Sequence, residues 1–179
     1  MVNRGGKTAG NIAIIGFMAT GKTSLARELA SYLGLRSVDI DNLIEERENR
    51  KISQIFKQDG EGYFRRLEKE IVKELSHLEG VVISCGGGVC LDPKNIKNLR
   101  KKNKIVLLEA SVEDILERTK GDRARPLLDR WDKKEAIRRL MADRKDQYRD
   151  AADVIIDTSG KRIREVRDEI IKELGAGED

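Results

Sequence analysis

The stretch that decides the fold is Asn11-Ile-Ala-Ile-Ile15-Gly16-Phe-Met-Ala-Thr-Gly21-Lys22-Thr23, in which a short apolar run passes into a glycine-bearing turn. The apolar run at positions 11–15 predicts a buried parallel strand. The turn, Gly16–Thr23, has the spacing G-x-x-x-x-G-K-[ST] of a phosphate-binding loop. Backbone N–H groups of such a loop surround an anion, and the next helix directs its N-terminus to the same point. The stretch therefore predicts a nucleoside triphosphate site.

Two side chains of this loop carry specific expectations. Lys22 is expected to reach the β- and γ-phosphates, and the hydroxyl of Thr23 is expected to coordinate Mg²⁺. The alternative is an ordinary glycine turn with an exposed lysine. We favour the phosphate loop, because the motif lies between a predicted strand and a predicted helix.

Outward from the loop, strands and helices alternate to the end of the chain. Apolar residues recur at helical spacing from Leu25 to Leu33, and Gly34 ends this helix. Later apolar stripes predict helices over Phe64–Leu78 and Ile163–Leu174, and Ser111 is a predicted helix N-cap. Further strands are predicted at Arg36–Asp39, Val81–Ser84, Ile105–Glu109 and Val154–Asp157. The alternation predicts an α/β domain in which helices cover both faces of a parallel sheet.

The composition limits the class of protein. The chain has 179 residues, of which 39% are hydrophobic and 38% charged, so we expect a single domain. Its polar, glycine-rich start predicts a flexible tail over residues 1–10, followed by the domain at 11–179. The formal charge of +4 comes from basic residues interleaved with acidic ones, which does not favour nucleic-acid binding. No apolar run approaches the ~20 residues of a membrane helix. The two cysteines, Cys85 and Cys90, favour a reducing cytoplasm.

Two further motifs lie where predicted strands end, which is where open parallel sheets bind ligands. Asp39 and Asp41 are one residue apart after the second strand. One is a candidate to support Mg²⁺ and the other to accept a hydrogen bond from a hydroxyl acceptor. The alternative is that Asp41 only caps the helix beginning near Asn42, and the spacing does not decide between the two. The three glycines at 86–88 favour close approach of the backbone to a ligand.

Arginines follow at several points of the chain, and arginine is suited to neutralising charge on a transferring phosphoryl group. Arg65 starts the helix of the Phe64–Leu78 stripe and, taken alone, is predicted to be solvated. The segment Lys120–Asp132 breaks the helical periodicity and predicts a mobile, basic lid. The arginines in or near this lid and the next helix are Arg118, Arg123, Arg125, Arg130 and Arg144.

Together these motifs resemble those of shikimate kinases, and the resemblance runs from Asn11 to about Leu174. It rests on six segments in register: Gly16–Thr23, Asp39–Asp41, the F-R-x-x-E of Phe64–Glu68, Gly86–Gly88, the R-P-L-L of Arg125–Leu128 and the R-x-x-x-Y of Arg144–Tyr148. The resemblance implies ATP-dependent phosphorylation of the 3-hydroxyl of shikimate, on the route to chorismate and the aromatic amino acids. It also implies a three-layer α/β/α P-loop kinase fold with a five-stranded parallel sheet.

Roles for individual residues follow from the same resemblance. It implies catalytic roles for Lys22, Asp41 and Arg125, with Asp41 binding the acceptor hydroxyl and acting as, or orienting for, the base. Metal binding by Thr23 and Asp39 is implied, with Mg²⁺ as the ion. The implied shikimate ligands are Asp41, Arg65, Gly87 and Arg144. The implied ATP ligands are Ala19, Thr20, Gly21, Lys22, Thr23, Ser24, Arg118 and Arg125.

Two departures from the family pattern and two rival functions complete the expectations. Ala19 stands where the family often has glycine, and Cys85 stands where it frequently has threonine, with Ser84 as a candidate substitute. The nearest rival is another small-molecule kinase of this fold, such as a gluconate kinase. The other is a non-catalytic ATP-binding or nucleic-acid-binding module. We expect a cytoplasmic monomer whose partners are ATP and shikimate, without nucleic acid or membrane.

Overall fold

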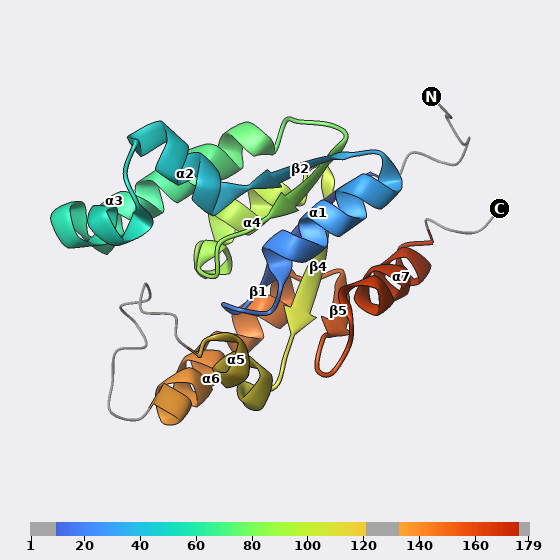
Figure 1. Cartoon of the computed structure of the whole chain (residues 1–179). Helices are drawn as coiled ribbons and strands as arrows, with labels where there is room; N and C mark the ends of the chain where they lie inside the picture. The colour runs from blue at the N-terminus through green and yellow to red at the C-terminus, as the bar shows by residue number, and fades with distance from the viewer. Residues whose placement is uncertain (1–9, 121–132, 176–179) are drawn as a thin grey trace.

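The computed structural model describes residues 10–120 and 133–175. The predicted lid from 121 onward and the predicted tail up to residue 9 lie outside the described residues. The strands are β1 (Asn11–Gly16), β2 (Arg36–Asp39), β3 (Val81–Ser84), β4 (Asn103–Glu109) and β5 (Val154–Asp157). They form the five-stranded parallel sheet that was predicted, and the structure gives its strand order as β2-β3-β1-β4-β5 (Figure 1).

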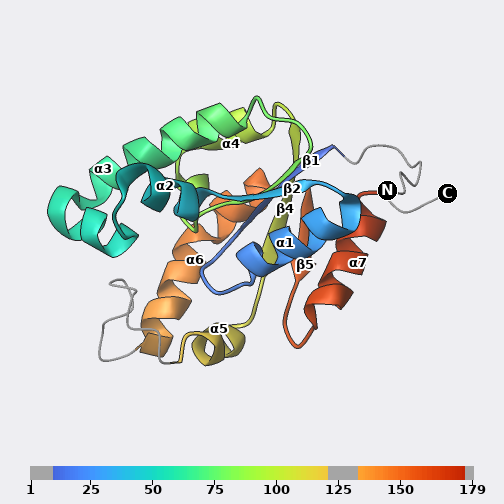
Figure 2. The ribbon, with the colours of Figure 1, turned by 45° about the horizontal axis from the view of Figure 1, so that its top comes forward.

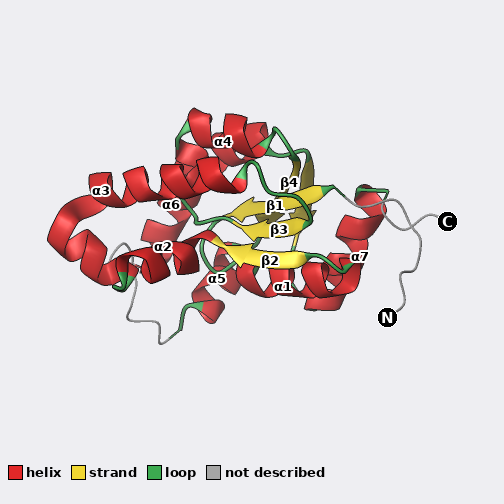
Figure 3. Cartoon of the chain, turned by 90° about the horizontal axis from the view of Figure 1, so that it is seen from above, coloured by secondary structure: helices red, strands yellow, loops and turns green. Residues whose placement is uncertain are grey.

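Helices cover both faces of this sheet. They are α1 (Lys22–Leu33), α2 (Ile40–Glu48), α3 (Ile52–Leu75), α4 (Pro93–Leu99), α5 (Val112–Arg118), α6 (Lys133–Ala151) and α7 (Ile163–Glu173), with a 3₁₀ turn, η1, at Val89–Leu91. Helices α1 and α7 lie side by side on one face (Figure 2), and α3 and α4 lie on the other (Figure 3). The three-layer α/β/α architecture is confirmed.

The central strand β1 shows why the sequence forms these layers. All six of its residues are buried, because neighbouring strands flank it on both edges and helices cover both faces. Ile12 and Ile14 pack with α1 and α7, whereas Ala13 and Ile15 pack with the helices of the other face. The period-two alternation of a strand therefore divides one apolar run between two cores. Within the described ranges, no helix is long and apolar enough to cross a bilayer.

The predicted element boundaries hold at most strands and fail at two places. Strand β4 begins at Asn103, two residues before the predicted start. Its first two residues, a buried asparagine and the exposed Lys104, are polar, so the apolar run used for the prediction begins only after them. Helix α3 begins at Ile52, so Arg65 lies inside it and not at its start, and Leu78 lies beyond its end. Gly60 is the cause, because its φ of 79° and ψ of 172° kink the helix and break the sequence pattern.

The kink at Gly60 places an arm, made of α2 and the part of α3 before Gly60, at the end of the sheet where the strands finish. Helix α2 follows β2 directly, and the first part of α3 packs against α2 (Figures 1 and 3). Arg50, between the two helices, donates to Glu48 and Asp59 at 2.5 and 2.7 Å. The arm starts next to the phosphate loop, because Asp39, immediately before α2, accepts a hydrogen bond from Thr23 at 2.8 Å.

Candidate active site

The phosphate loop connects β1 to α1 in a conformation that requires glycine. Gly16 has a φ of 144°, and a Cβ there would lie 2.5 Å from the carbonyl oxygen of Leu108. Gly21 has a φ of 94° and caps the N-terminus of α1. The loop closes on itself, because the Thr20 hydroxyl and the Lys22 ammonium both donate to the Phe17 carbonyl, at 2.9 and 2.7 Å. Lys22 therefore lies across the loop, where phosphates are expected.

Ala19 is the residue of this loop that departs from the glycine common in the family. Its φ of 60° lies in the left-handed region, which costs an alanine roughly 1–2 kcal/mol. The carbonyl of Ala19 accepts a hydrogen bond from Arg118 Nη1 at 3.2 Å. The fold therefore holds Ala19 in the conformation that a glycine would adopt more readily.

The end of β2 supplies oxygen ligands beside the loop. The Thr23 hydroxyl donates to Asp39 Oδ2 at 2.8 Å and lies 3.4 Å from the Ser84 hydroxyl. Asp39 Oδ1 accepts the backbone N–H of Asn42 at 3.2 Å, so Asp39 is the N-cap of α2. The capping role considered for Asp41 is therefore wrong, because α2 begins at Ile40 and contains Asp41 in its first turn.

Glycines 86 and 88 make room for a charged cluster. A Cβ on Gly86 would lie 2.7 Å from Asp41 Oδ1 and 3.1 Å from Glu68 Oε1, and one on Gly88 would overlap the guanidinium of Arg65. The two carboxyl groups and Arg65, which come from α2 and α3, thus converge on the segment Gly86–Gly88, here called the glycine loop. Because side chains already fill these two positions, their glycines are explained by packing alone.

Arg65 is oriented by carboxylates on its own helix. Its Nη1 donates to Glu68 Oε2 at 2.9 Å, while Nε and Nη2 donate to Glu61 Oε1 at 3.2 and 3.0 Å. A guanidinium has five N–H donors, so two of them have no partner among the described residues. The prediction of a solvated Arg65, made from its helical position alone, is wrong, since the side chain is three-quarters buried.

Burial changes the acid–base properties of both carboxyl groups. The pKa of Asp41 is raised by burial and by the charge of Asp39, against the opposing charges of Lys22 and Arg65. The pKa of Glu68 is also raised by burial, against the pull of Arg65. Glu68 Oε1 has no hydrogen-bond partner within the described part of the chain. A buried acceptor oxygen without a partner is uncommon in folded proteins.

The backbone of Gly87 differs from its neighbours. Its carbonyl oxygen accepts hydrogen bonds from Tyr148 Oη at 2.5 Å and Arg144 Nη1 at 3.3 Å. A Cβ on Gly87 would meet nothing nearer than 3.7 Å, the backbone nitrogen of Met18. Packing therefore does not require a glycine at position 87, which favours a ligand as the reason for it.

A pocket of about 210 Å³ opens on the other side of the loop. Arg118 lines it, where Nη1 lies 3.4 Å from the Thr158 hydroxyl and Nη2 donates to the Thr158 carbonyl at 3.3 Å. The pocket is lined by Thr20, Gly21, Ser24, Leu25, Leu108, Arg118, Thr158, Lys161, Ile163 and Val166. Its apolar floor adjoins the phosphate loop, which is the arrangement that a nucleotide base and its phosphates need.

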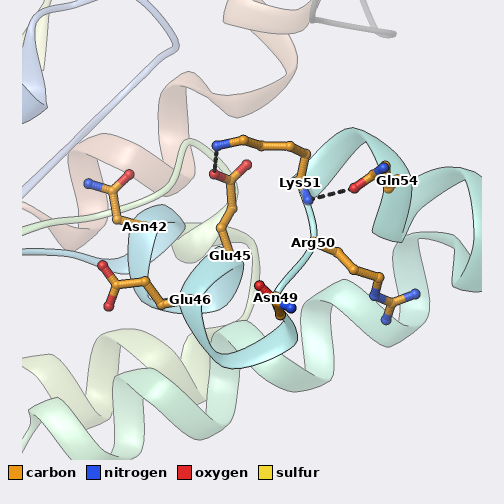
Figure 4. Close-up of a pocket in the computed structure, with 7 residues that line it drawn as sticks. All are labelled: Asn42, Glu45, Glu46, Asn49, Arg50, Lys51 and Gln54. Carbon is orange, nitrogen blue, oxygen red and sulfur yellow. Dashed lines mark hydrogen bonds and ion pairs between the residues drawn. The ribbon is translucent and has the colours of Figure 1, made fainter.

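A larger pocket, of about 460 Å³, lies on the arm between α2 and α3 (Figure 4). Within its lining Glu45 pairs with Lys51, whereas Arg50 pairs with Glu48 and Asp59, which do not line the pocket. Glu45 accepts from Lys51 Nζ at 2.6 Å and from the backbone N–H of Ile52 at 3.0 Å, and the Lys51 N–H donates to Gln54. None of the residues that line it belongs to the phosphate loop or the Arg65 cluster. We assign it no chemistry.

The expected site residues fall into two groups around the loop. Those expected to bind the acceptor or metal converge at the ends of β2 and β3, namely Lys22, Thr23, Asp39, Asp41, Arg65, Gly87 and Arg144. Those expected to bind the nucleotide border the smaller pocket or the Arg118 contact, namely Ala19, Thr20, Gly21, Ser24 and Arg118. Arg125 lies outside the described residues.

Two residues of this site have no role in the sequence-based expectations. Glu68 orients Arg65, and Tyr148 holds the carbonyl of Gly87. Each ends a quoted motif, F-R-x-x-E or R-x-x-x-Y, and stands three or four residues after an arginine. That spacing places each residue on the same helix face as its arginine, which is the sequence signal that could have predicted the two contacts.

Comparison with known proteins identifies the family. A family model described as shikimate kinase matches residues 18–175. A shikimate kinase from Caldanaerobacter subterraneus is 43% identical over 90% of this chain and 94% of its own. One from Geobacter sulfurreducens is 44% identical over 89% of this chain and 88% of its own.

The chain belongs to the shikimate kinase family.

Solved structures agree with this membership. A shikimate kinase from Acinetobacter baumannii, solved in complex with shikimate, has a TM-score of 0.87 at 33% identity and covers 91% of each chain. A gluconokinase from Sinorhizobium meliloti covers 94% of this chain, but with a TM-score of 0.57 at 16% identity. That second likeness shows the P-loop kinase fold alone. The gluconate kinase alternative is therefore not favoured, and the chain is a kinase of the shikimate kinase family.

Proposed function

We propose that this chain transfers the γ-phosphoryl group of ATP to the 3-hydroxyl of shikimate, giving shikimate 3-phosphate and ADP. One observation carries the assignment of the acceptor: Arg65, Asp41, Gly87 and Arg144 converge beside the phosphate loop, at the carboxyl ends of β2 and β3. Arginines that can bind a carboxylate and an aspartate that can bind a hydroxyl thus lie on one side of the position where phosphates are expected.

Arg65 and Arg144 are proposed to bind the carboxylate of shikimate. Arg65 keeps two N–H donors without a partner among the described residues, and its guanidinium is already oriented by Glu68 and Glu61. Arg144 comes from α6, on the opposite side of the glycine loop, and contributes only a 3.3 Å hydrogen bond to Gly87. Arginine suits this task because its planar donors match a carboxylate.

Asp41 is proposed to accept the proton of the attacking hydroxyl. Burial raises the pKa of its carboxyl, which makes its ionised form a stronger base than a solvated aspartate. As the oxygen–phosphorus bond forms, the hydroxyl proton passes to Asp41, and the bond between the γ-phosphorus and the β-phosphate oxygen breaks. Lys22 and the N–H groups of the loop stabilise the charge that develops on the phosphoryl oxygens.

The oxygen ligands fit the magnesium ion that such kinases use. Thr23 and Asp39 supply a hydroxyl and a carboxylate 2.8 Å apart, with the Ser84 hydroxyl beside them. Mg²⁺ is usually held by one or two protein oxygens together with substrate phosphates, so no cluster of several carboxylates is needed. When bound, the ion would neutralise charge on the phosphates. Cys85 takes no part here, because burial raises the pKa of its thiol well above the usual value.

The nucleotide is proposed to place its base in the smaller pocket. Arg118 offers a planar cation in the lining of this pocket, and Leu25, Ile163 and Val166 offer apolar surface. The backbone of Gly21 and the hydroxyl of Ser24 border the same pocket on the phosphate side. The route from base to phosphates therefore follows the start of α1.

The experiment that tests this proposal is shikimate-dependent release of ADP, measured for the parent and for Arg65→Lys. Lysine keeps the charge and loses the planar donors, so we expect the shikimate KM to rise about ten- to hundredfold, the effect of a lost charged hydrogen bond. The ATP KM should change little. A variant that rejects a carboxylate-reduced analogue of shikimate as strongly as the parent does would contradict the role of Arg65.

The same assay separates the rival functions. Gluconate also carries a carboxylate and hydroxyl groups, and turnover of gluconate in preference to shikimate would overturn the proposed acceptor. Binding of ATP without turnover of either would favour a non-catalytic module. We further propose a single domain over residues 11–179 that works as a monomer in the cytoplasm, which sedimentation and cell fractionation would test.

A further inference from the structure

Helix α6 directs two hydrogen-bond donors at a single backbone oxygen. Tyr148 Oη donates to the carbonyl of Gly87 at 2.5 Å, and Arg144 Nη1 donates to the same oxygen at 3.3 Å. The two residues are four positions apart, so they share one face of the helix. A carbonyl oxygen has two lone pairs and accepts both donors at once. The shorter bond belongs to the tyrosine.

Tyr148 is buried at this contact. Only 6% of its surface is exposed, and its ring packs in the core formed by α3, α4 and η1 against the sheet. Burial raises the pKa of its hydroxyl to about 12, so the group is a neutral donor at any physiological pH. A buried tyrosine hydroxyl needs polar partners, and here it donates to the Gly87 carbonyl and also hydrogen-bonds with the side chain of Arg144.

The Gly87 peptide needs such a restraint more than most. A glycine has wide backbone freedom, so its own φ and ψ do not fix the direction of its N–H and C=O groups. Its Cα lies between the phosphate loop and α6, because a Cβ there would be 3.8 Å from the Gly16 carbonyl and 3.9 Å from Tyr148 Oη. At its neighbours, Gly86 and Gly88, the space that a Cβ would need is taken by the carboxyl of Asp41 and the guanidinium of Arg65.

We propose that Tyr148 is a positioning residue of the acceptor site. Its hydroxyl holds the Gly87 carbonyl and so fixes the glycine loop, while Arg144 leaves that carbonyl to bind the carboxylate of the acceptor. The exchange leaves no buried oxygen unpaired, because the shorter of the two bonds remains. This inference rests on the proposed roles of Gly87 and Arg144 in shikimate binding.

The test is Tyr148→Phe, which removes one oxygen and keeps the ring. We expect kcat/KM for shikimate to fall about five- to tenfold, the size of one net hydrogen bond, with the ATP KM changed less than twofold. Shikimate binding without nucleotide, measured by calorimetry, should weaken by the same factor. Equal changes in both KM values, or a lower unfolding temperature with unchanged kinetics, would show a structural role and overturn the proposal.

Tyr63→Phe is the matched control. The Tyr63 hydroxyl donates to Glu48 Oε1 at 3.0 Å, between α3 and α2, so this variant also loses one phenolic hydrogen bond. We expect its shikimate KM to stay within twofold of the parent value. If both tyrosine variants raised the shikimate KM equally, the effect would not be specific to the Gly87 contact, and the proposal would fail.

Arg144→Lys separates this inference from the function on which it rests. If it leaves the shikimate KM unchanged, the proposed carboxylate site is wrong. If it raises that KM while Tyr148→Phe does not, only the inference on Tyr148 fails. A 3-fluorotyrosine at position 148 retains the hydroxyl, and its shikimate KM should stay within twofold of the parent. A fivefold rise in that variant would contradict the proposal even if Tyr148→Phe did not fold.

Discussion

At the scale of single residues, the site keeps two carboxyl groups in surroundings that disfavour their charge. Burial raises the pKa of both Asp41 and Glu68, and Arg65 only partly opposes it. Removing an ionised carboxylate from water without full pairing costs free energy of folding. Groups kept at such a cost commonly serve chemistry, since activity and stability make conflicting demands on a site.

We expect Asp41→Asn to lower kcat for shikimate-dependent ADP release by about 10²–10⁴-fold, the usual contribution of a positioned general base. Asparagine keeps the size of the side chain but cannot accept the hydroxyl proton. Circular dichroism should show an unchanged fold. A variant that keeps a kcat near that of the parent would remove Asp41 from the chemistry and leave it a substrate-orienting role at most.

The same substitution should raise stability at neutral pH. Because the native pKa of Asp41 lies above its ordinary value of 3.8, the folded state holds the proton more tightly than the unfolded state. The contribution of Asp41 to the unfolding free energy therefore falls as pH rises from about 4 through the raised pKa. Thermal unfolding across this range should show that the stability of Asp41→Asn relative to the parent increases as pH increases. A variant that is less stable than the parent at pH 7 would contradict the sign.

At the scale of elements, the kink in α3 sets the direction of the arm. Gly60 has a φ of 79° and a ψ of 172°, a conformation that side chains other than glycine avoid. Gly62, two residues on, has no positive φ, and a Cβ at either position would meet nothing within 4 Å. The two glycines thus differ in backbone conformation and not in available space.

This difference gives a matched pair of substitutions. Gly60→Ala should lower the free energy of unfolding by about 1–3 kcal/mol, because alanine is strained in that conformation. Gly62→Ala should raise it by about 0.4–1 kcal/mol, because alanine restricts the unfolded chain at no native cost. Urea denaturation followed by circular dichroism measures both. Equal effects of the two changes would mean that the kink does not depend on Gly60.

At the scale of the whole molecule, the sheet separates two apolar cores. Ile71 of α3 belongs to the core on one face, and Ile170 of α7 belongs to the core on the other. Both side chains are 1% exposed or less. Strand β1 contributes side chains to both cores, so the backbone of the sheet lies between them.

We expect Ile71→Val and Ile170→Val to destabilise the protein independently. Each should lower the unfolding free energy by about 0.5–1.5 kcal/mol, from the loss of one buried methylene. The double variant should equal the sum within about 0.5 kcal/mol, as for distant sites without shared partners. Chemical denaturation of the four proteins provides the comparison. A larger deviation from the sum would show that packing changes on one face reach the other.

The sequence by itself determined the strand–loop–helix of the phosphate site, four of the five strand positions and the edge of the sheet where ligands are expected. Each of these depends on neighbouring residues, through the apolar run of β1, the glycine spacing and the carboxylates that end β2. Local chemistry is sufficient there, because parallel strands bring their carboxyl ends to one edge whatever the details of packing. The six motifs in register were enough to indicate the family.

Only the tertiary structure decided how those residues act on one another. It showed that Asp39 and not Asp41 caps α2, that Glu68 orients Arg65, and that Tyr148 donates to Gly87 across 61 positions of sequence. Thr23 and Ser84 are likewise 61 positions apart and meet at 3.4 Å. Sequence periodicity reports which face a residue shares with its near neighbours, and it does not report which distant backbone lies opposite. Packing of α6 and α3 against the glycine loop settles that, because it fixes where each buried polar atom finds a partner.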